Sequence, residues 1–471
     1  MPSDPEPVAI PPEQPQSEDP QGVTLCAGEE AFLPWLREDL ERLCLEEGKL
    51  TQDEAEMFRE FCRLLSTYLH LDFHGNLRTI EELYAHFDPD RETVPLGDAA
   101  GSHQDELEVV RCFRELAERS NYYEISAKMI EHCLDAVTLI DLKTKVELDD
   151  FDHVVCYARG DIHSETTVRK MWKTRKLELD VLQRVVLLLK YKNVAYFART
   201  GRPRKEELRS DLIYTFYYKH VPKYDLEFLF PNVEIGMNLK DKLLLGVPAI
   251  GGSILVLTKL VPQILIITGL VVFLVAGPEA ARRMGVSDES VNQVLPAVTA
   301  LLGLTIALGG FAFKQWNAIR RKRFEFLKNV AEQLFYRKLA NNQAVFNRLM
   351  SSAEAEESKE MILALYQLWT GPEEGQTAAG LDRRLEDWIQ RRLDAKVDFD
   401  IDGPISYLTR LSGSPPGLGE TVLLDTDEDG RMCPAPLPEA VALMRHLVTN
   451  SALGVNPSPA SSSASSSTSG E

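Results

Sequence analysis

The sequence predicts a mainly helical protein with a small α+β domain and a two-helix transmembrane hairpin that lies between cytoplasmic parts. Three observations predict this fold class. Apolar residues recur at spacings of three and four over long segments, which is typical of helices. Three shorter segments are rich in β-branched and aromatic residues, which is typical of strands. Two long apolar segments interrupt a chain whose net charge is −20.

Composition confines any membrane portion to a minority of the chain. Hydrophobic residues make up 44% and charged residues 26%, as in water-soluble domains, and the mean hydropathy is −0.18. The seven cysteines are odd in number and scattered, and no two form a C-x-x-C pair. This pattern argues against a disulfide framework and a zinc site, and it indicates a reducing compartment.

The two ends of the chain are expected to be disordered. Residues 1–24 form an acidic, proline-rich tail without the basic or apolar run of a signal or transit peptide. Residues 451–471 form a Ser-rich tail of low complexity. Neither tail can bury enough apolar surface to offset the entropy of ordering it.

The first half of the chain divides into a helical region over 25–100 and an α+β domain over 101–237. Helical periodicity covers 28–75 and runs again from Glu106 to about Leu139. The predicted strands are HVVCYAR at 153–159, RVVLLLKYK at 184–192 and IYTFYYKHV at 213–221.

Residues 294–313 predict a transmembrane helix, because twenty consecutive residues carry no charge and about 20 are needed to cross the hydrocarbon core. A buried helix of a soluble core seldom stays apolar on every face over this length.

The thirty-five residues at 243–277 are harder to interpret, because they contain Lys259 and are too many for one upright span. We predict a span over 260–277, with Lys259 at the interface and 238–259 as an interfacial entry segment. A single tilted helix from about 250 and two short re-entrant helices remain as alternatives.

Flanking charges predict the orientation of this hairpin. Lys240, Lys242 and Lys259 precede the first span, and a basic cluster containing IRRKR follows the second. The only cations in the loop at 278–293 are Arg282 and Arg283, against three acidic residues. The positive-inside rule therefore predicts that the loop is external and that both flanks are cytoplasmic.

The chain after the hairpin is predicted to be helical over 314–372, with Asn341 or Asn342 as a helix cap. A small α/β C-terminal module follows over 380–450. Its expected order is a helix, a strand at 397–401, a helix, a hairpin at 421–433 and a last helix. This order suggests a winged-helix-like module.

Residues 165–210 are locally basic, with thirteen Lys/Arg and five Asp/Glu. One interpretation is a solvated face balanced by acidic helices elsewhere. The other is a surface held against anionic lipid head groups; nucleic acid is not expected, because no binding motif accompanies the charge. The candidate lipid-facing residues are Lys259, Arg320, Arg321, Lys322, Arg323, Lys173, Arg175, Lys176, Arg202, Arg204 and Lys205.

Several residues could suggest catalysis or metal binding, but each has a simpler structural interpretation. DFDIDG at 398–403 and DTDEDG at 425–430 resemble the start of a calcium loop, but both lack the glutamate at position twelve. His70 and His74 share a helix face without a third ligand. His153, Cys156 and His163 lie near one another in sequence, and Cys156 is best explained as a small buried residue. We expect no catalytic residue, cofactor or metal.

Three blocks resemble the transmembrane protein 143-like family, a set of membrane proteins that share a domain of unknown function. The blocks are YAHFDPDRET at 84–93, the segment 220–252 that begins HVPKYDLEFLFPNVEIG, and the segment 310–365 that begins GFAFKQWNAIRRKRFEF. The resemblance implies a two-span membrane protein with soluble flanking domains, and it brings no catalytic residues.

These observations predict an integral membrane protein that acts as a non-enzymatic scaffold or adaptor, with the lipid bilayer and an unknown protein as partners. A subunit of an oligomeric channel or transporter is the alternative, because small residues such as Gly303 and Gly309 permit close helix packing. The missing basic N-terminus favours a bacterial inner membrane, with both termini cytoplasmic, over a mitochondrial membrane.

Overall fold

The structure is a computed structural model that describes most of the chain outside the predicted membrane segments. The described residues are 31–92, 101–126, 128–130, 142–170, 173–202, 209–237, 338–372 and 375–453, with single positions between 310 and 337. They form two compact units. The larger unit is made from residues 1–129, 148–223 and 338–471, and the smaller from 130–147 and 224–337.

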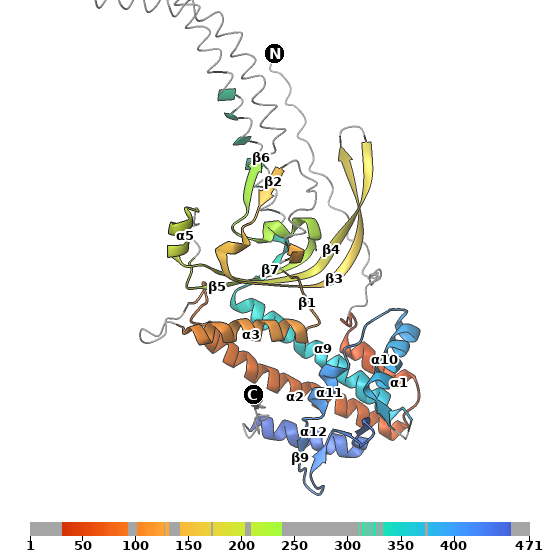
Figure 1. Cartoon of the computed structure of the whole chain (residues 1–471). Coiled ribbons are helices and arrows are strands. Elements are labelled where there is room, and N and C mark those ends of the chain that lie inside the picture. The colour runs from red at the N-terminus through yellow and green to blue at the C-terminus, as the bar shows by residue number, and fades with distance from the viewer. Residues whose placement is uncertain are drawn as a thin grey trace, which may run out of the picture. The chain divides into compact units, whose positions relative to one another are not determined.

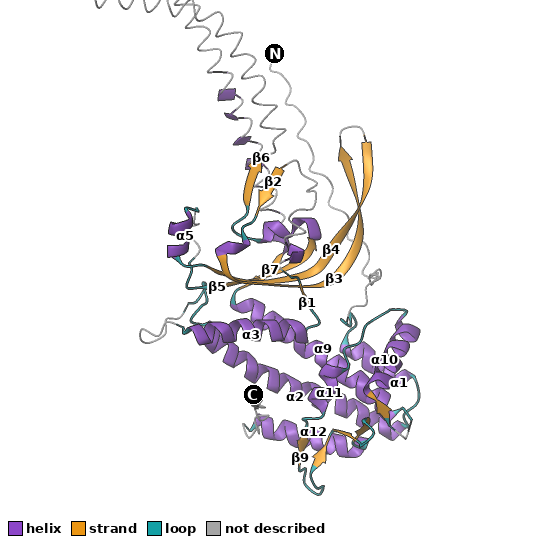
Figure 2. Cartoon of the chain, viewed as in Figure 1, coloured by secondary structure: helices purple, strands orange, loops and turns teal. Residues whose placement is uncertain are grey.

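Helices build most of the larger unit (Figures 1 and 2). Two of them begin with a capping box, in which Thr51 pairs with Glu54 and Ser102 pairs with Asp105. The helices are α1 (Arg37–Glu46), α2 (Gln52–Tyr84), α3 (His103–Arg119), α5 (Val194–Thr200), α9 (Gln343–Trp369), α10 (Ala378–Leu393), α11 (Asp402–Leu408) and α12 (Leu437–Ala452). Short 3-10 helices occupy Leu148–Asp150 and Lys223–Leu229.

The main sheet has five antiparallel strands in the order β1-β3-β4-β5-β7. Its strands are β1 (Tyr123–Glu124), β3 (Phe151–Lys170), β4 (Lys173–Tyr191), β5 (Ile213–Pro222) and β7 (Lys338–Asn341). Helices α3 and α9 lie against one face of this sheet (Figure 1). The strands predicted at 153–159, 184–192 and 213–221 are confirmed, and β3 and β4 are much longer than predicted.

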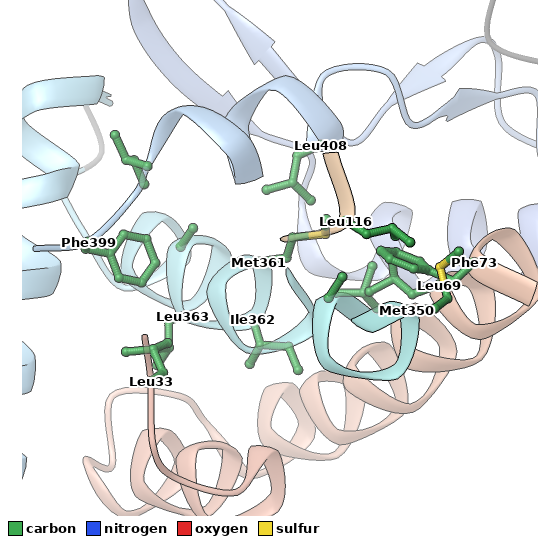
Figure 3. Close-up of a cluster of buried hydrophobic side chains, with 14 of the residues drawn as sticks. Leu33, Leu69, Phe73, Leu116, Met350, Met361, Ile362, Leu363, Phe399 and Leu408 are labelled. Carbon is green, nitrogen blue, oxygen red and sulfur yellow. The ribbon is translucent and has the colours of Figure 1, made fainter. Parts of the chain in front are cut away.

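Helix α9 is the centre of the core, because neighbours surround it on all sides. Every residue from Met361 to Leu368 is buried, as expected for a helix without a polar face. Leu363 of α9 lies near Leu33 and Phe399, and Met350 lies near Leu69 and Phe73 of α2 (Figure 3). The buried side chains of α1, α2, α3, the sheet and the C-terminal helices form one continuous cluster around this helix.

The C-terminal segment packs on this core through α9 and α2. A three-stranded sheet has the order β11-β12-β8, and β10 pairs with β9. The strands are β8 (Gln376–Thr377), β9 (Ser412–Gly413), β10 (Thr421–Val422), β11 (Leu424–Thr426) and β12 (Arg431–Pro434). The hairpin expected at 421–433 is therefore present.

The strand expected at 397–401 is wrong. Residues 394–401 lie outside any strand, although Val397, Phe399 and Ile401 are buried and Asp398 and Asp400 are exposed. Buried apolar and exposed acidic residues thus alternate as predicted, but they belong to an extended segment that packs its apolar residues on the core. The helical region expected over 314–372 is also interrupted, because Lys338–Asn341 is strand β7.

The smaller unit contains β2 (Leu142–Lys145) and β6 (Glu234–Met237), which pair antiparallel. As a whole, the described structure is a mixed α+β protein, mostly helical, with antiparallel sheets. Over these described ranges, no helix combines the length and apolar content that a membrane span requires. The predicted span 260–277 lies outside the described residues, as does 294–313 except for Gly310 and Phe313.

Candidate functional site: the exit end of the main sheet

The chain leaves the main sheet and returns to it at neighbouring strands. It leaves after Pro222, the last residue of β5, and re-enters at Lys338, the first residue of β7. The two strands pair antiparallel, with Tyr217 opposite Ala340 and Tyr218 opposite Lys338. The long segment between them, which contains both predicted spans, therefore begins and ends at the same sheet.

Strands β3 and β4 continue beyond this point as a two-stranded arm (Figure 1). Pro222 lies opposite Val181, whereas β3 and β4 stay paired as far as Lys170 and Lys173. The arm therefore projects from the end of the sheet at which β5 ends. We call this the exit end, defined by Pro222, Lys338 and the first pair of the arm, Ile162 and Val181.

The base of the arm is held by Lys223, the residue at which the chain leaves the sheet. Its Nζ lies 2.5 Å from Asp161 Oδ2 and 3.7 Å from Asp180 Oδ2, so it bridges both strands of the arm. Burial alone would lower the pKa of Lys223, but the two carboxylates outweigh it and raise the pKa. Gly160 precedes Asp161 with a positive φ of 77°, and a Cβ there would meet the Gln183 side chain at 2.6 Å.

Asn342 fixes the point where the returning chain enters α9. Its Nδ2 donates to Asp90 Oδ2 at 2.6 Å, and its Oδ1 accepts a hydrogen bond from Thr215 N at 3.3 Å. Its φ of 51° is unusual for a residue other than glycine, so surrounding contacts must hold this conformation. Asn342 is the N-cap residue of α9, as predicted for Asn341 or Asn342, but its side chain makes no capping hydrogen bond.

Replacing Asn342 with alanine should lower the free energy of unfolding by about 2–3 kcal/mol, because it leaves the buried Thr215 N–H without its side-chain acceptor. Asn341 is the matched control, since its Nδ2 donates to the same Asp90 oxygen at 2.7 Å near the surface. Asn341→Ala should cost less than about 1 kcal/mol. Equal losses in thermal or denaturant melts of the two variants would contradict this role for Asn342.

The candidate lipid-facing residues divide into three groups. Lys173, Arg175 and Lys176 occupy the far end of the arm on β4. Arg202 instead pairs with Asp150, with Nη1 2.8 Å from Oδ1, and Arg320 and Arg321 are exposed. The remaining candidates lie outside the described residues; they are Lys259, Arg204, Lys205, Lys322 and Arg323.

Glu106, a buried residue of α3, is the partner of His153, one of the histidines considered for catalysis. Glu106 Oε1 lies 2.9 Å from His153 Nε2, and Glu106 Oε2 lies 2.5 Å from Lys190 Nζ. Burial would raise the pKa of Glu106, but Lys190, His103 and His153 outweigh it and lower the pKa. Cys156 is buried, opposite Leu187 in the sheet. His153 is thus part of an ion-pair cluster around Glu106.

The residues considered for metal binding make local structural contacts. Asp427 Oδ1 accepts hydrogen bonds from the backbone N–H groups of Asp429 and Arg431, which closes the β11-β12 hairpin. His70 and His74 stack with ring centroids 6.2 Å apart, and His70 Nδ1 lies 3.3 Å from Glu354. Among the residues that the structure describes, no three His, Cys, Asp or Glu side chains are grouped as metal ligands.

Buried charges on α9 were missed by the sequence analysis. Glu356, Glu357, Lys359 and Glu360 are all buried within one turn and a half of the helix. Glu360 Oε1 accepts a hydrogen bond from Asn121 Nδ2 at 2.7 Å. Desolvation by burial raises the pKa of Glu360 well above its ordinary value, and the carboxylates of Glu356 and Glu357 add to the effect.

The raised pKa of Glu360 predicts a pH-dependent contribution to stability. A carboxyl group that holds its proton longer when folded stabilises the fold fully below its unfolded pKa, and this contribution is lost as pH rises through the folded pKa. Glu360→Gln, which is always neutral, should therefore gain stability relative to the unmodified chain as pH rises above about 4.5. Melting both proteins over a pH series measures the difference; a difference that does not change with pH would contradict the assignment.

Lys223 and Gly160 were not predicted as residues that shape the exit end, and Asn342 was predicted only as a helix cap. Gly160 has a local sequence signal, because an isolated glycine within a strand pattern often marks a bend. The roles of Lys223 and Asn342 depend on partners that are distant in sequence.

A family model described as a protein of unknown function (DUF3754) matches residues 182–344. The match begins at Leu182, just inside the base of the arm, and ends at the start of α9, so it contains both the point where the chain leaves the sheet and the point where it returns. No solved structure matches the chain. Residues 182–344, which include Pro222 and Lys338 of the exit end and the segment inserted between them, are thus similar to a domain of unknown function, DUF3754.

Proposed function

We propose that this protein is a non-enzymatic scaffold or adaptor anchored in a membrane by a helical hairpin at 260–277 and 294–313. The larger unit would be the cytoplasmic part that the hairpin holds beside the bilayer. The blocks that resemble the transmembrane protein 143-like family are in keeping with this proposal, and the match to a domain of unknown function leaves the activity open.

The observation that carries the proposal is the pairing of β5 with β7. These strands precede and follow the inserted segment, and they can form backbone hydrogen bonds only on the same side of a membrane. An even number of crossings between Pro222 and Lys338 satisfies this condition. Two spans with Lys259 at the interface therefore fit better than three spans, in which Lys259 would separate two of the helices.

The C-terminal topology supports a role in binding a protein partner. The chain order α9, β8, α10, α11, β9, β10, β11, β12, with β12 central in the three-stranded sheet, supports the winged-helix-like module that the sequence suggests. Seven exposed side chains near α11 and the β11-β12 turn are acidic, against the exposed cations Lys396 and Arg410. This excess of negative charge would repel a nucleic-acid backbone. These acidic residues are Asp398, Asp400, Asp402, Asp425, Asp427, Glu428 and Asp429.

The test is the topology of the loop between the predicted spans. Ser287→Cys places a thiol in that loop, and the exposed Cys433 reports on the C-terminal part of the larger unit. A membrane-impermeant maleimide is added to intact spheroplasts and then, in a parallel sample, after lysis. Cys156 is buried and therefore should not react in either sample of folded protein.

Reaction of the loop thiol before lysis, with Cys433 reacting only afterwards, is the expected result. Reaction of Cys433 before lysis would place the larger unit outside and overturn the cytoplasmic scaffold. If neither thiol reacts before lysis, the hairpin with an external loop is wrong.

A further inference from the structure

A short segment ahead of the first helix, residues 31–36, is attached to the core without belonging to a helix or a sheet. Its Leu33 is completely buried and lies near Leu363 of α9 (Figure 3). Its last residue, Leu36, is 67% exposed. We call residues 31–33, which make the polar contacts described next, the latch.

Three side chains of the larger unit bind the backbone of the latch. Asn121 Nδ2 donates to the carbonyl oxygen of Ala31 at 3.0 Å. Glu356 Oε2 accepts a hydrogen bond from Leu33 N at 3.2 Å, and Lys359 Nζ donates to the carbonyl oxygen of Leu33. These bonds hold backbone groups that every extended peptide has, which is how proteins gain affinity for extended peptides.

Two cations contact the ring of Phe32 and favour an aromatic side chain at this position. The guanidinium carbon of Arg159 lies 3.8 Å from the ring centroid, and Lys359 Nζ lies 5.1 Å from it. The same guanidinium lies 4.5 Å from the Tyr122 ring centroid and donates to the Ser120 carbonyl at 2.9 Å. Arg159 is therefore held in place by contacts that do not involve the latch.

The residues after the latch keep it extended and allow it to leave. Pro34 disfavours the helical conformation at Leu33, the residue before it. A segment that is already extended loses less conformational entropy when it binds. Leu36 is the N-cap residue of α1 but makes no side-chain capping hydrogen bond, so release of the latch breaks no cap of this helix.

The site under the latch is charged, and this makes it easier to uncover than an apolar site. We call Asn121, Arg159, Glu356 and Lys359 the socket. Glu356 and Lys359 are almost completely buried as an ion pair. Burying such a pair carries a large desolvation penalty, which is recovered when water reaches the two charges. Water therefore replaces the latch at a lower cost than it would at a purely apolar surface.

From these observations we infer that residues 31–33 are a releasable latch, and that the socket is a binding site for an extended partner peptide in which an aromatic residue precedes leucine. The latch occupies this site in the resting protein and keeps such a partner out. This device deepens the proposed adaptor function and rests on it, because an adaptor needs a partner. It does not depend on which side of a membrane the larger unit lies.

The experiment uses the full-length chain in detergent and a fluorescent, end-blocked peptide of residues 31–38. An open variant, Phe32→Ala with Leu33→Ala, weakens the latch and leaves the socket unchanged. Fluorescence anisotropy should show saturable binding of the peptide to this variant. The natural chain should bind the peptide at least about a hundredfold more weakly, because a tethered latch competes at an effective concentration on the order of millimolar.

Altered peptides test whether the same contacts are made in trans. Phe32→Ala or Leu33→Ala in the peptide should weaken binding to the open variant about tenfold. Leu36→Ala is the matched control and should leave the affinity unchanged, because Leu36 is exposed. Asn121→Gly in the open variant removes the donor to Ala31 and should weaken binding about fivefold. Glycine suits this position, since the φ of Asn121 is 57°.

A folded open variant that does not bind the peptide, or that binds every altered peptide as well as the original, would overturn the inference. If the open variant does not fold, hydrogen exchange in the natural chain decides. The Leu33 N–H should then be protected at least about a hundredfold less than the Leu363 N–H. Equal protection would mean that the segment leaves only when the whole core opens, and the latch would be rejected.

The outcome of this experiment is separate from that of the topology test. Peptide binding by the open variant, combined with a loop thiol that does not react before lysis, would reject the hairpin and leave the latch in place. The expected labelling of the loop, combined with absence of peptide binding, would reject the latch and leave the anchor in place.

Discussion

Lys359→Met should lower the free energy of unfolding by about 3–5 kcal/mol, because it leaves the buried Glu356 carboxylate without its cation. Lys359 Nζ lies 2.7 Å from Glu356 Oε1 and also donates to the backbone carbonyl of Leu33. Both side chains are almost completely buried. Burial raises the pKa of Glu356 and lowers that of Lys359, and the attraction between the two opposes both shifts.

A second substitution shows whether the unpaired charge of Glu356 causes this loss of stability. Glu356→Gln in the Lys359→Met background removes the charge and keeps an acceptor for the Leu33 N–H, which donates to Glu356 Oε2 at 3.2 Å. The double variant should therefore recover much of the stability, because a neutral buried pair avoids most of the desolvation penalty. Chemical denaturation of the three proteins measures this recovery.

The exposed pair Asp39–Arg42 is the control, since it has the same spacing of three residues on a helix and a 2.7 Å contact. Arg42→Met should change stability by less than about 1 kcal/mol. If Lys359→Met has an equally small effect, then Glu356 takes up a proton or a water and the pair is not essential.

The strands of the main sheet could be predicted because their cores are locally distinctive. Val185 to Leu189 and Ile213 to Tyr218 are β-branched, aliphatic or aromatic over most of their length, and such residues favour strands in most contexts. Helices α2 and α3 likewise have local signals in the sequence, namely apolar periodicity and the residues of a capping box.

The arm could not be predicted from the same signals. Residues 165–176 are dominated by Lys, Arg, Thr and Glu, so they resemble a solvated basic face rather than a strand. Only the register places Val168 on the same face of the ribbon as Leu177 and Leu179. Lys173, Arg175 and Lys176 were therefore recognised as candidate basic residues, but their position on a projecting ribbon was not.

Strand β7 and helix α9 show a different limit of prediction from local sequence. Lys338–Asn341 continues a helical pattern in sequence and becomes a strand because β5 offers it an edge. The EESKE segment at 356–360 has the composition of an exposed helix face, yet it is buried because the N-terminal segment around Leu33 covers it. Contacts between residues that are distant in sequence decide both outcomes: β7 pairs with β5 more than a hundred positions earlier, and Glu356 contacts Leu33 more than three hundred positions earlier.

Phe346→Ala should lower the free energy of unfolding by about 3–5 kcal/mol, because it removes a fully packed aromatic ring from the core. The Phe346 ring centroid lies 4.8 Å from that of Tyr84 and 5.9 Å from that of Phe113. Tyr84 in turn donates its hydroxyl to the carbonyl of Ile213 at 2.7 Å. One side chain after the inserted segment thus contacts two helices that precede it.

This position tests whether the two flanks of the inserted segment fold as one cooperative unit. Hydrogen exchange in the Phe346→Ala variant should show α2, α3 and α9 losing protection by the same factor, since a shared core opens as a whole. Leu107→Ala on the exposed side of α3 should change stability by no more than about 0.5 kcal/mol. Loss of protection confined to α9 would mean that the segments before and after the insertion are stable separately. The shared core would then give no support to the placement of both flanks on the same side of the membrane, and the argument for an even number of crossings would rest on the strand pairing alone.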